Sequence, residues 1–146
     1  MKKLLLIWMS LISISLGSTP FTLSEIDELH VVLENSSKMV DKKTETLLEK
    51  MMKDKLASLE VKTDTYSEES LVLMIGENEF GDIKFLNAKL LIVSQVKRPK
   101  ANERILGIIY MMDDLFDTRE PNVDMIESLE YMLSEFGDQY IEENAK

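Results

Sequence analysis

Apolar residues recur at helical spacing in the segment that follows the N-terminal apolar run. When each residue advances by about 100°, they form one stripe, made of Ile26, Leu29, Leu33, Val40, Leu47 and Met51. Thr22 and Glu25 match a capping box at the start of this stripe, and Phe21 is placed to pack on Ile26. Small polar residues interrupt the stripe near Asn35. The pattern predicts a long N-terminal helix with a weak point near Asn35.

A different pattern begins near residue 58. Apolar and β-branched residues alternate with charged residues over positions 59–65, and a short apolar run at 71–75 ends in the sequence GENEFGD. A longer apolar stretch covers positions 83–96. Short apolar runs closed by glycine and polar residues are typical of strands in a small antiparallel sheet. Residues 83–97 also carry helical spacing, so a strand and a helix both fit there.

Two amphipathic helices are predicted in the C-terminal third. The first follows Pro99 and has the apolar positions Ile105, Ile108, Ile109, Met112, Leu115 and Phe116. The second follows Pro121 and has the apolar positions Val123, Ile126, Leu129, Met132, Leu133, Phe136 and Tyr140. The connection DTREPN is short enough for an antiparallel helical hairpin. We therefore predict an α+β fold in which a long N-terminal helix and this C-terminal helical hairpin pack on a small antiparallel sheet. An all-α bundle is the alternative.

The first 17 residues match a secretory signal peptide. Two lysines precede an apolar run at positions 4–16, and Ser15-Leu16-Gly17 fits the small-x-small rule for cleavage after Gly17. The run is shorter than the roughly 20 residues of a membrane-spanning helix, which disfavours a permanent anchor. The sequence thus predicts a signal peptide at 1–17, one mature domain at 18–146, and a periplasmic or secreted bacterial protein without a stable membrane anchor after cleavage.

The 146-residue chain is acidic, with a formal net charge of −10, and cleavage would remove two lysines and no acids, which brings the charge to −12. This balance disfavours nucleic acid and anionic membranes as partners and favours basic proteins or cations. Cysteine is absent. Disulfides and acylation at a lipobox cysteine are therefore excluded, and the domain must fold on its hydrophobic core alone.

The single histidine, His30, is a candidate metal ligand. In a helix, Asp27, His30 and Glu34 would occupy neighbouring positions, where two carboxylates and an imidazole suit a divalent cation. Three ligands from one helix rarely complete a site, so an ordinary exposed histidine is the alternative. No cofactor is expected.

Ten methionines suggest soft-metal binding as an alternative function, because thioethers and His30 would suit copper(I) or silver. Their positions on apolar stripes favour a role in the core or in an adaptable binding surface instead. Met51 and Met52 are the candidates for partner contact. A basic island provides a second set of candidates: Lys97, Arg98, Lys100 and Arg104.

Motifs for common catalytic machinery are missing from the sequence, including the G-x-S-x-G elbow, the phosphate-binding loop and the dinucleotide fingerprint. Dense acids leave a carboxylate-dependent hydrolase as a second alternative; they are Asp113, Asp114, Asp117, Glu120 and Asp124. We expect a non-catalytic role in binding another envelope or secreted protein, with basic proteins among the candidates. An adaptor, a chaperone-like factor or an immunity protein would fit this role.

Overall fold

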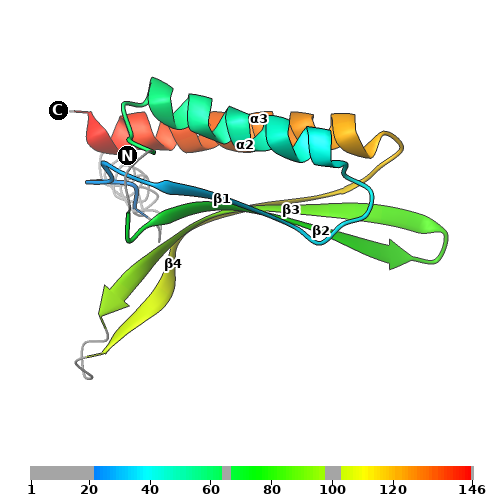
Figure 1. Cartoon of the computed structure of the whole chain (residues 1–146), viewed down its shortest axis with the longest axis horizontal. Helices are drawn as coiled ribbons and strands as arrows, with labels where there is room; N and C mark the ends of the chain where they lie inside the picture. The colour runs from blue at the N-terminus through cyan, green and yellow to red at the C-terminus, as the bar shows by residue number, and fades with distance from the viewer. Residues whose placement is uncertain (1–21, 64–66, 98–102, 146) are drawn as a thin grey trace, which may run out of the picture.

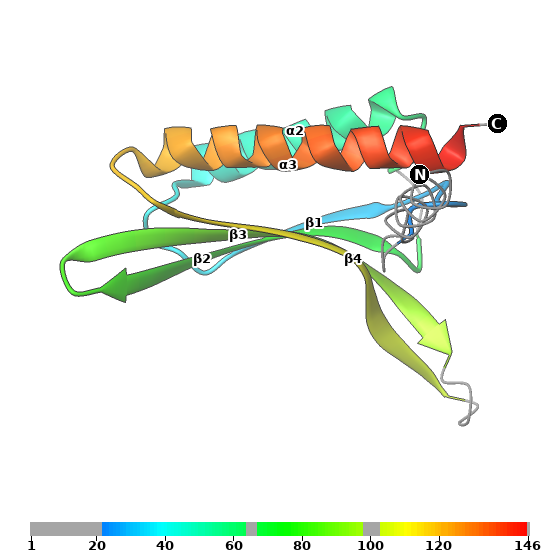
Figure 2. The same ribbon diagram turned by 180° about the vertical axis from the view of Figure 1, so that it is seen from behind.

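The computed structural model describes residues 22–63, 67–97 and 103–145. The elements in chain order are β1 (His30–Asn35), α2 (Lys42–Ser58), β2 (Ser70–Phe80), β3 (Ile83–Lys97), β4 (Arg104–Asp117) and α3 (Pro121–Asn144). They form two layers, in which α2 and α3 lie side by side on one face of a single sheet (Figures 1 and 2). This arrangement leaves the opposite face of the sheet without a covering helix.

The sheet has four strands in the order β1-β2-β3-β4. β1 and β2 are parallel, and α2 is the crossover between them, as a parallel pair requires. β2, β3 and β4 then follow as antiparallel neighbours, and α3 returns across the face that α2 already covers. The sheet is therefore mixed, which corrects the prediction of a purely antiparallel sheet.

The hydrophobic core lies between the sheet and the two helices. One set of alternating strand residues faces the helices and is buried, including Leu71, Leu73, Ile75, Leu86, Ala88, Leu90 and Ile92. The helices bury Leu48, Met52, Leu56, Met125, Leu129, Met132 and Phe136 against them. Tyr110 of β4 meets the Phe136 ring edge-on, with the ring centroids 5.5 Å apart. This contact fixes α3 over β4.

The first helix starts at Lys42, whereas the sequence predicts a start after Thr22. Asp41 is its N-cap, and its carboxylate accepts a hydrogen bond of 2.7 Å from the N–H of Thr44. The predicted capping box does not form, because Glu25 has a φ of 65°, which no helix permits. The Thr22 hydroxyl donates instead to Glu143 in α3. The long N-terminal helix is therefore a wrong prediction.

Residues predicted in the middle of that helix form β1. Val31 and Leu33 stand opposite Leu71 and Leu73 in the parallel register. Spacings of three and four residues fit a helix, but the sequence HVVLEN also places Val31 and Leu33 on one face of a strand. A partner strand forty residues away decides between the two patterns.

The segment predicted as the first helix of a C-terminal hairpin forms β4. Its residues alternate between the two faces of the sheet and pair with β3 from Phe85 to Lys97. The predicted second helix is confirmed as α3, so DTREPN connects a strand to a helix. The helical hairpin and the all-α alternative are both wrong.

The strands predicted at 71–75 and 83–96 are confirmed as parts of β2 and β3, which form an antiparallel hairpin. Most of the predicted strand at 59–65 is not one: Lys62 makes a single parallel bridge with Glu28, and residues 64–66 lie outside the described residues. The pairing of β3 with β4 shifts register between Ile92 and Val93. Near this bulge, the end of β3 and the start of β4 bend away from the helices (Figure 1).

Candidate functional site

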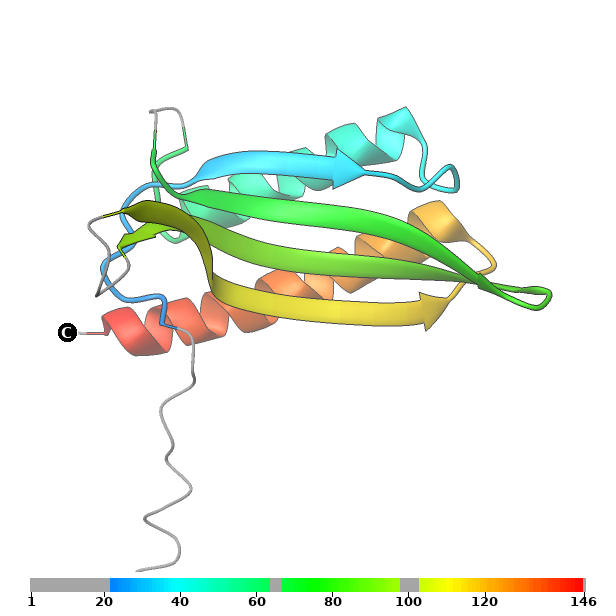
Figure 3. The ribbon, with the colours of Figure 1, turned by 90° about the horizontal axis from the view of Figure 1, so that it is seen from below.

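The sheet face opposite the helices carries several large, exposed apolar side chains. No described helix lies on it, and the bent ends of β3 and β4 project to this side at one end of the sheet (Figures 1 and 3). Because side chains alternate along a strand, the residues between the buried core positions point to this side. One row crosses all four strands and is apolar throughout: Val32, Val72, Leu91 and Met111 are direct neighbours in register.

Large side chains on this side are exposed. The exposed fraction is 39% for Met74, 43% for Met111, 51% for Ile108 and 58% for Leu115. Leu91, at the centre of the row, is only 6% exposed because its neighbours surround it. We call the following set the uncovered face: Val32, Val72, Met74, Leu91, Val93, Ile108, Met111 and Leu115. Continuous apolar surfaces of this kind on a small domain usually mark a binding site.

Charged residues also lie on this side of the sheet. The row beside the central one contains Glu34, Met74, Lys89 and Asp113 in register across the sheet. Glu34 and Asp113 thus stand on the two edge strands, while Lys89 lies on the inner strand β3, so charged groups are interspersed with the apolar side chains of this face.

The apolar surface continues at the tip of the β2–β3 hairpin. Phe80 is 81% exposed, and its partner Ile83 is 53% exposed. The two-residue turn between them needs the positive φ of 62° at Gly81, the first central position, where glycine is favoured. Alternation along β2 places Phe80 on the same side of the sheet as Met74.

The structure does not assemble the predicted cation site. Asp27 precedes β1, and His30 and Glu34 are exposed on β1 itself. Four residues in a strand span about 13 Å, so these two side chains lack the proximity that a helix would give them. Among the described residues, no three histidine, aspartate or glutamate side chains are grouped to hold a metal ion.

The methionines are divided between the core and the uncovered face. Met52, Met125 and Met132 are fully buried, so Met52 cannot contact a partner, and Met51 is partly buried against the core. The exposed thioethers, Met74 and Met111, lie on β2 and β4 with β3 between them. The described residues therefore present no accessible cluster of three thioethers for a soft metal.

The basic island lies at the far end of the β3–β4 hairpin. Lys97 ends β3 and Arg104 begins β4, while Arg98 and Lys100 lie outside the described residues. Arg104 forms an exposed ion pair of 3.3 Å with Glu68. This end bends away from the helices, so the described cations stand apart from the central apolar row (Figure 2).

The predicted acid cluster spans the end of β4 and the start of α3. A cavity of about 320 Å³ there is lined by Asp114, Asp117, Asp124 and Glu127, among others. Two of these acids make structural hydrogen bonds: Asp114 accepts from the Ser128 hydroxyl, and Asp124 accepts from the Thr118 hydroxyl. These bonds tie β4 and the connecting turn to α3. Their hydroxyl partners indicate a structural role for these two acids.

Sequence reasoning missed the uncovered face because it assigned β4 to a helix. The available signal was the alternation in RILGIIYMMDDLFD, where both sets of alternate positions contain large apolar residues. A strand with apolar residues on both sides predicts either burial on both faces or a binding face. Burial of Tyr110 and exposure of Leu115 show which side is covered.

Comparisons with known proteins identify no family. No family model matches the chain, and no curated protein sequence is significantly similar to it. Among solved structures, the chain is similar to a minor lipoprotein from Acinetobacter baumannii, solved at 2.35 Å, with 14% identity over 78% of this chain and 88% of that chain. The TM-score of 0.24 is too low to support a conclusion about fold or function.

No described helix is long and apolar enough to cross a membrane.

Proposed function

We propose that this chain is an exported, non-catalytic protein of the bacterial envelope that binds another protein through the uncovered face. The observation that carries the proposal is the exposed apolar surface across the sheet, with Met111 exposed in the central row and Met74 exposed in the row beside it. The N-terminal pattern of basic and apolar residues supports export. Methionine side chains adapt to differently shaped partners, which suits an adaptor or a chaperone-like factor.

The chemistry of the partner follows from the charges of the surface. The chain is strongly acidic, with a net charge of −10, and Glu34 and Asp113 stand at the rim of the uncovered face. The partner should present an apolar patch with basic residues around it. Complementary charge accelerates association and suppresses acidic competitors.

Site-specific photocrosslinking in the envelope tests the binding surface. A benzoylphenylalanine introduced at Met111 should crosslink to one reproducible partner. The same group at Leu47 of α2 is the matched control, because both side chains are 43% exposed. Met111→Glu should abolish co-purification of that partner while leaving the melting temperature within a few degrees of the parent. Equal crosslinking from both positions would contradict the proposal.

Export is tested separately by mass spectrometry of the protein recovered from the envelope. The N-terminus should be Ser18, one residue after Gly17. Recovery of the chain with residues 1–17 still attached, from the cytoplasm only, would refute export without deciding whether the uncovered face binds a protein.

A further inference from the structure

The free edge of β1 is a second surface, separate from the uncovered face. Parallel pairing uses the backbone groups of alternate residues. The N–H of His30 donates to the carbonyl of Glu69, the residue before β2, and the N–H of Ser36 donates to the carbonyl of Ile75 in β2. The intervening residues, Val31 and Leu33, therefore direct their N–H and C=O groups away from β2. No described residue hydrogen-bonds these four groups.

The same edge is already paired with a backbone segment at one end. The N–H of Leu29 donates to the carbonyl of Lys62, and the N–H of Lys62 donates to the carbonyl of Asp27, each at 2.9 Å. This bridge pairs the segment around Lys62 with the edge immediately before β1. The geometry of the edge is thus suitable for strand addition, and pairing stops two residues before Val31.

Helix α2 forms the second wall of a groove along this edge. A cavity of about 310 Å³ is lined by four consecutive β1 residues, 30–33, and by Lys42, Glu45, Thr46 and Glu49 of α2. Consecutive strand residues line a cavity together only along an edge, because their side chains alternate between the two faces. An edge strand beside a helix is the arrangement in which extended peptides bind by strand addition.

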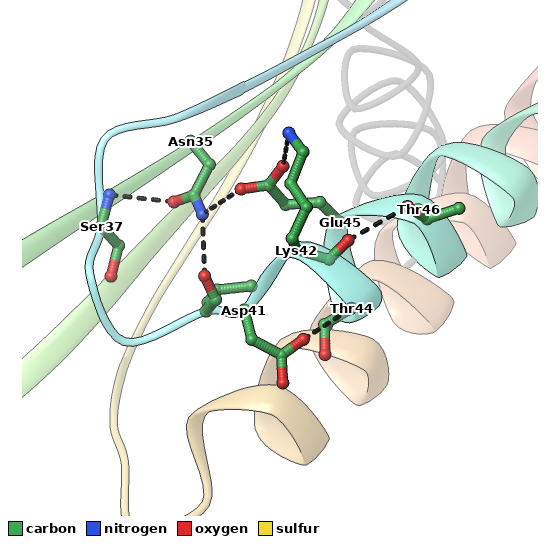
Figure 4. A network of polar contacts seen from close by, with 8 residues as sticks. Asn35, Ser37, Asp41, Lys42, Thr44, Glu45 and Thr46 are labelled. Atoms are coloured by element: carbon green, nitrogen blue, oxygen red, sulfur yellow. Dashed lines mark hydrogen bonds and ion pairs between the residues drawn. The ribbon is translucent and has the colours of Figure 1, made fainter.

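The groove is closed at its other end by the turn between β1 and α2. The Asn35 side-chain amide donates to the carbonyl of Val40 at 3.1 Å and to Glu45 at 2.9 Å, and its oxygen accepts from the N–H of Ser37 (Figure 4). Hydrogen bonds from Lys42 and Asn35 hold the pKa of the Glu45 carboxyl below its usual value, so this network persists at neutral pH. Between Lys62 and this turn, the edge accommodates about four or five extended residues, or roughly 13 to 17 Å.

These closed ends disfavour a second copy of the chain as the occupant. In an antiparallel pair centred on Val32, Asn35 of the other copy would stand beside Leu29, where the Lys62 carbonyl already lies. The net charge of −10 adds repulsion between copies. A short extended segment meets neither obstacle.

Charge identifies the chemistry of that segment. Glu45 and Glu49 are already paired with Lys42 and Lys53. Glu34 is exposed on β1, and no described residue forms an ion pair with it. A basic side chain on the added strand would lie next to Glu34. The apolar side chain at the adjacent position would point to the other face and lie between Leu33 and Thr46.

We propose that the free edge of β1 is a peptide-binding groove, which takes an extended segment of another protein, alternately basic and apolar, as a fifth strand of the sheet. This inference goes beyond the proposed function, because it concerns the edge of the sheet rather than the uncovered face.

The test uses the purified protein and the blocked peptide Ac-Lys-Val-Lys-Val-Lys-NH₂, followed by two-dimensional ¹H–¹⁵N NMR. We expect saturable shifts of the Val31 and Leu33 amides. Two further peptides carry N-methyl groups on alternate residues, one on the lysines and one on the valines. In an extended strand, the N–H groups of only one of these two sets of residues point to β1. One peptide should therefore lose at least tenfold in affinity while the other binds as before. The peptide Ac-Glu-Val-Glu-Val-Glu-NH₂ should bind at least tenfold more weakly.

Two tryptophan variants locate the site. Thr46→Trp fills the groove and should reduce binding at least tenfold, whereas Ala57→Trp, at another exposed position of α2, should leave binding unchanged. Absence of shifts at Val31 and Leu33, or equal binding of both N-methylated peptides, would overturn the proposal. So would a concentration-dependent dimer that protects these amides from exchange without peptide. Met111→Glu should leave peptide binding unchanged, so failure of this proposal and failure of the proposed function are distinguishable.

Discussion

Truncation of two side chains in β4 tests whether residues 104–117 form a strand. The strand buries Tyr110, which is 3% exposed, and exposes Leu115, which is 58% exposed. The helical pattern in the sequence predicts the reverse, because Leu115 belongs to its apolar stripe and Tyr110 does not. The substitutions Tyr110→Ala and Leu115→Ala therefore have opposite consequences under the two interpretations.

The expected magnitudes follow from burial. Removing a fully buried aromatic side chain destabilises a domain by about 3–5 kcal/mol, and the edge-on contact of Tyr110 with Phe136 supplies about 0.5–1.5 kcal/mol of that loss. Removing an exposed side chain changes stability by about 0.5 kcal/mol. Since domains of this size are stable by about 5–15 kcal/mol, Tyr110→Ala should remain measurable but strongly weakened.

Urea unfolding followed by far-ultraviolet circular dichroism measures both effects. With a slope of about 2 kcal/mol/M, Tyr110→Ala should lower the midpoint by about 1.5–2.5 M, and Leu115→Ala by less than about 0.5 M. Tyr110→Phe keeps the ring and should stay close to the parent, which assigns the loss to ring packing. If Leu115→Ala were as destabilising as Tyr110→Ala, the strand assignment of β4 would be refuted.

Three further predictions concern α3 and its contacts. Gly137 is buried within α3, and an added methyl group would overlap only the flexible end of the Lys55 side chain; Gly137→Ala should therefore stabilise the protein by about 0.5–1 kcal/mol through helix propensity, measured as a higher urea midpoint. Burial raises the pKa of Glu143, but hydrogen bonds that include one from the N–H of Leu23 outweigh it and hold the pKa below 4.5. That contact should be lost as the pH falls through the lowered pKa of Glu143. Amide exchange of Leu23 should then become faster in the parent protein, whereas in Glu143→Gln this exchange should already be fast and should not change. Burial raises the pKa of the Tyr110 phenol to about 12; the folded state keeps its proton above pH 10 and the unfolded state does not, so stability should fall between pH 10 and 12, and by less in Tyr110→Phe.

The predictions that held depend on local sequence. Residues 123–140 keep helical spacing over several turns and start at Pro121, and α3 forms where they predict it. The glycine and polar residues of GENEFGD predicted a turn between two strands, and a turn forms there only at Gly81 and Asp82, because residues 76–80 extend β2. Such signals act within a few residues and need no distant partner.

The predictions that failed involve residues whose spacing fits both a helix and a strand. Val31 and Leu33 lie in β1 because Leu71 and Leu73 stand opposite them. Tyr110 is buried because Phe136 packs on it, although the helical stripe excluded it. The candidate metal ligands lie apart for the same reason: a helical placement would have brought His30 and Glu34 together, whereas both lie on β1, which separates them.

By itself, the sequence determined the acidic charge, the absence of cysteine, the presence of both helices and strands and the position of α3, and it predicts an export signal. These properties follow from composition or from short-range periodicity. Only the tertiary structure decided that β4 is a strand, which side of it faces the helices, and that the edge of β1 stays free. Each of these depends on pairing between segments far apart in the chain, and burial energy is gained only when the whole sheet assembles beneath α2 and α3.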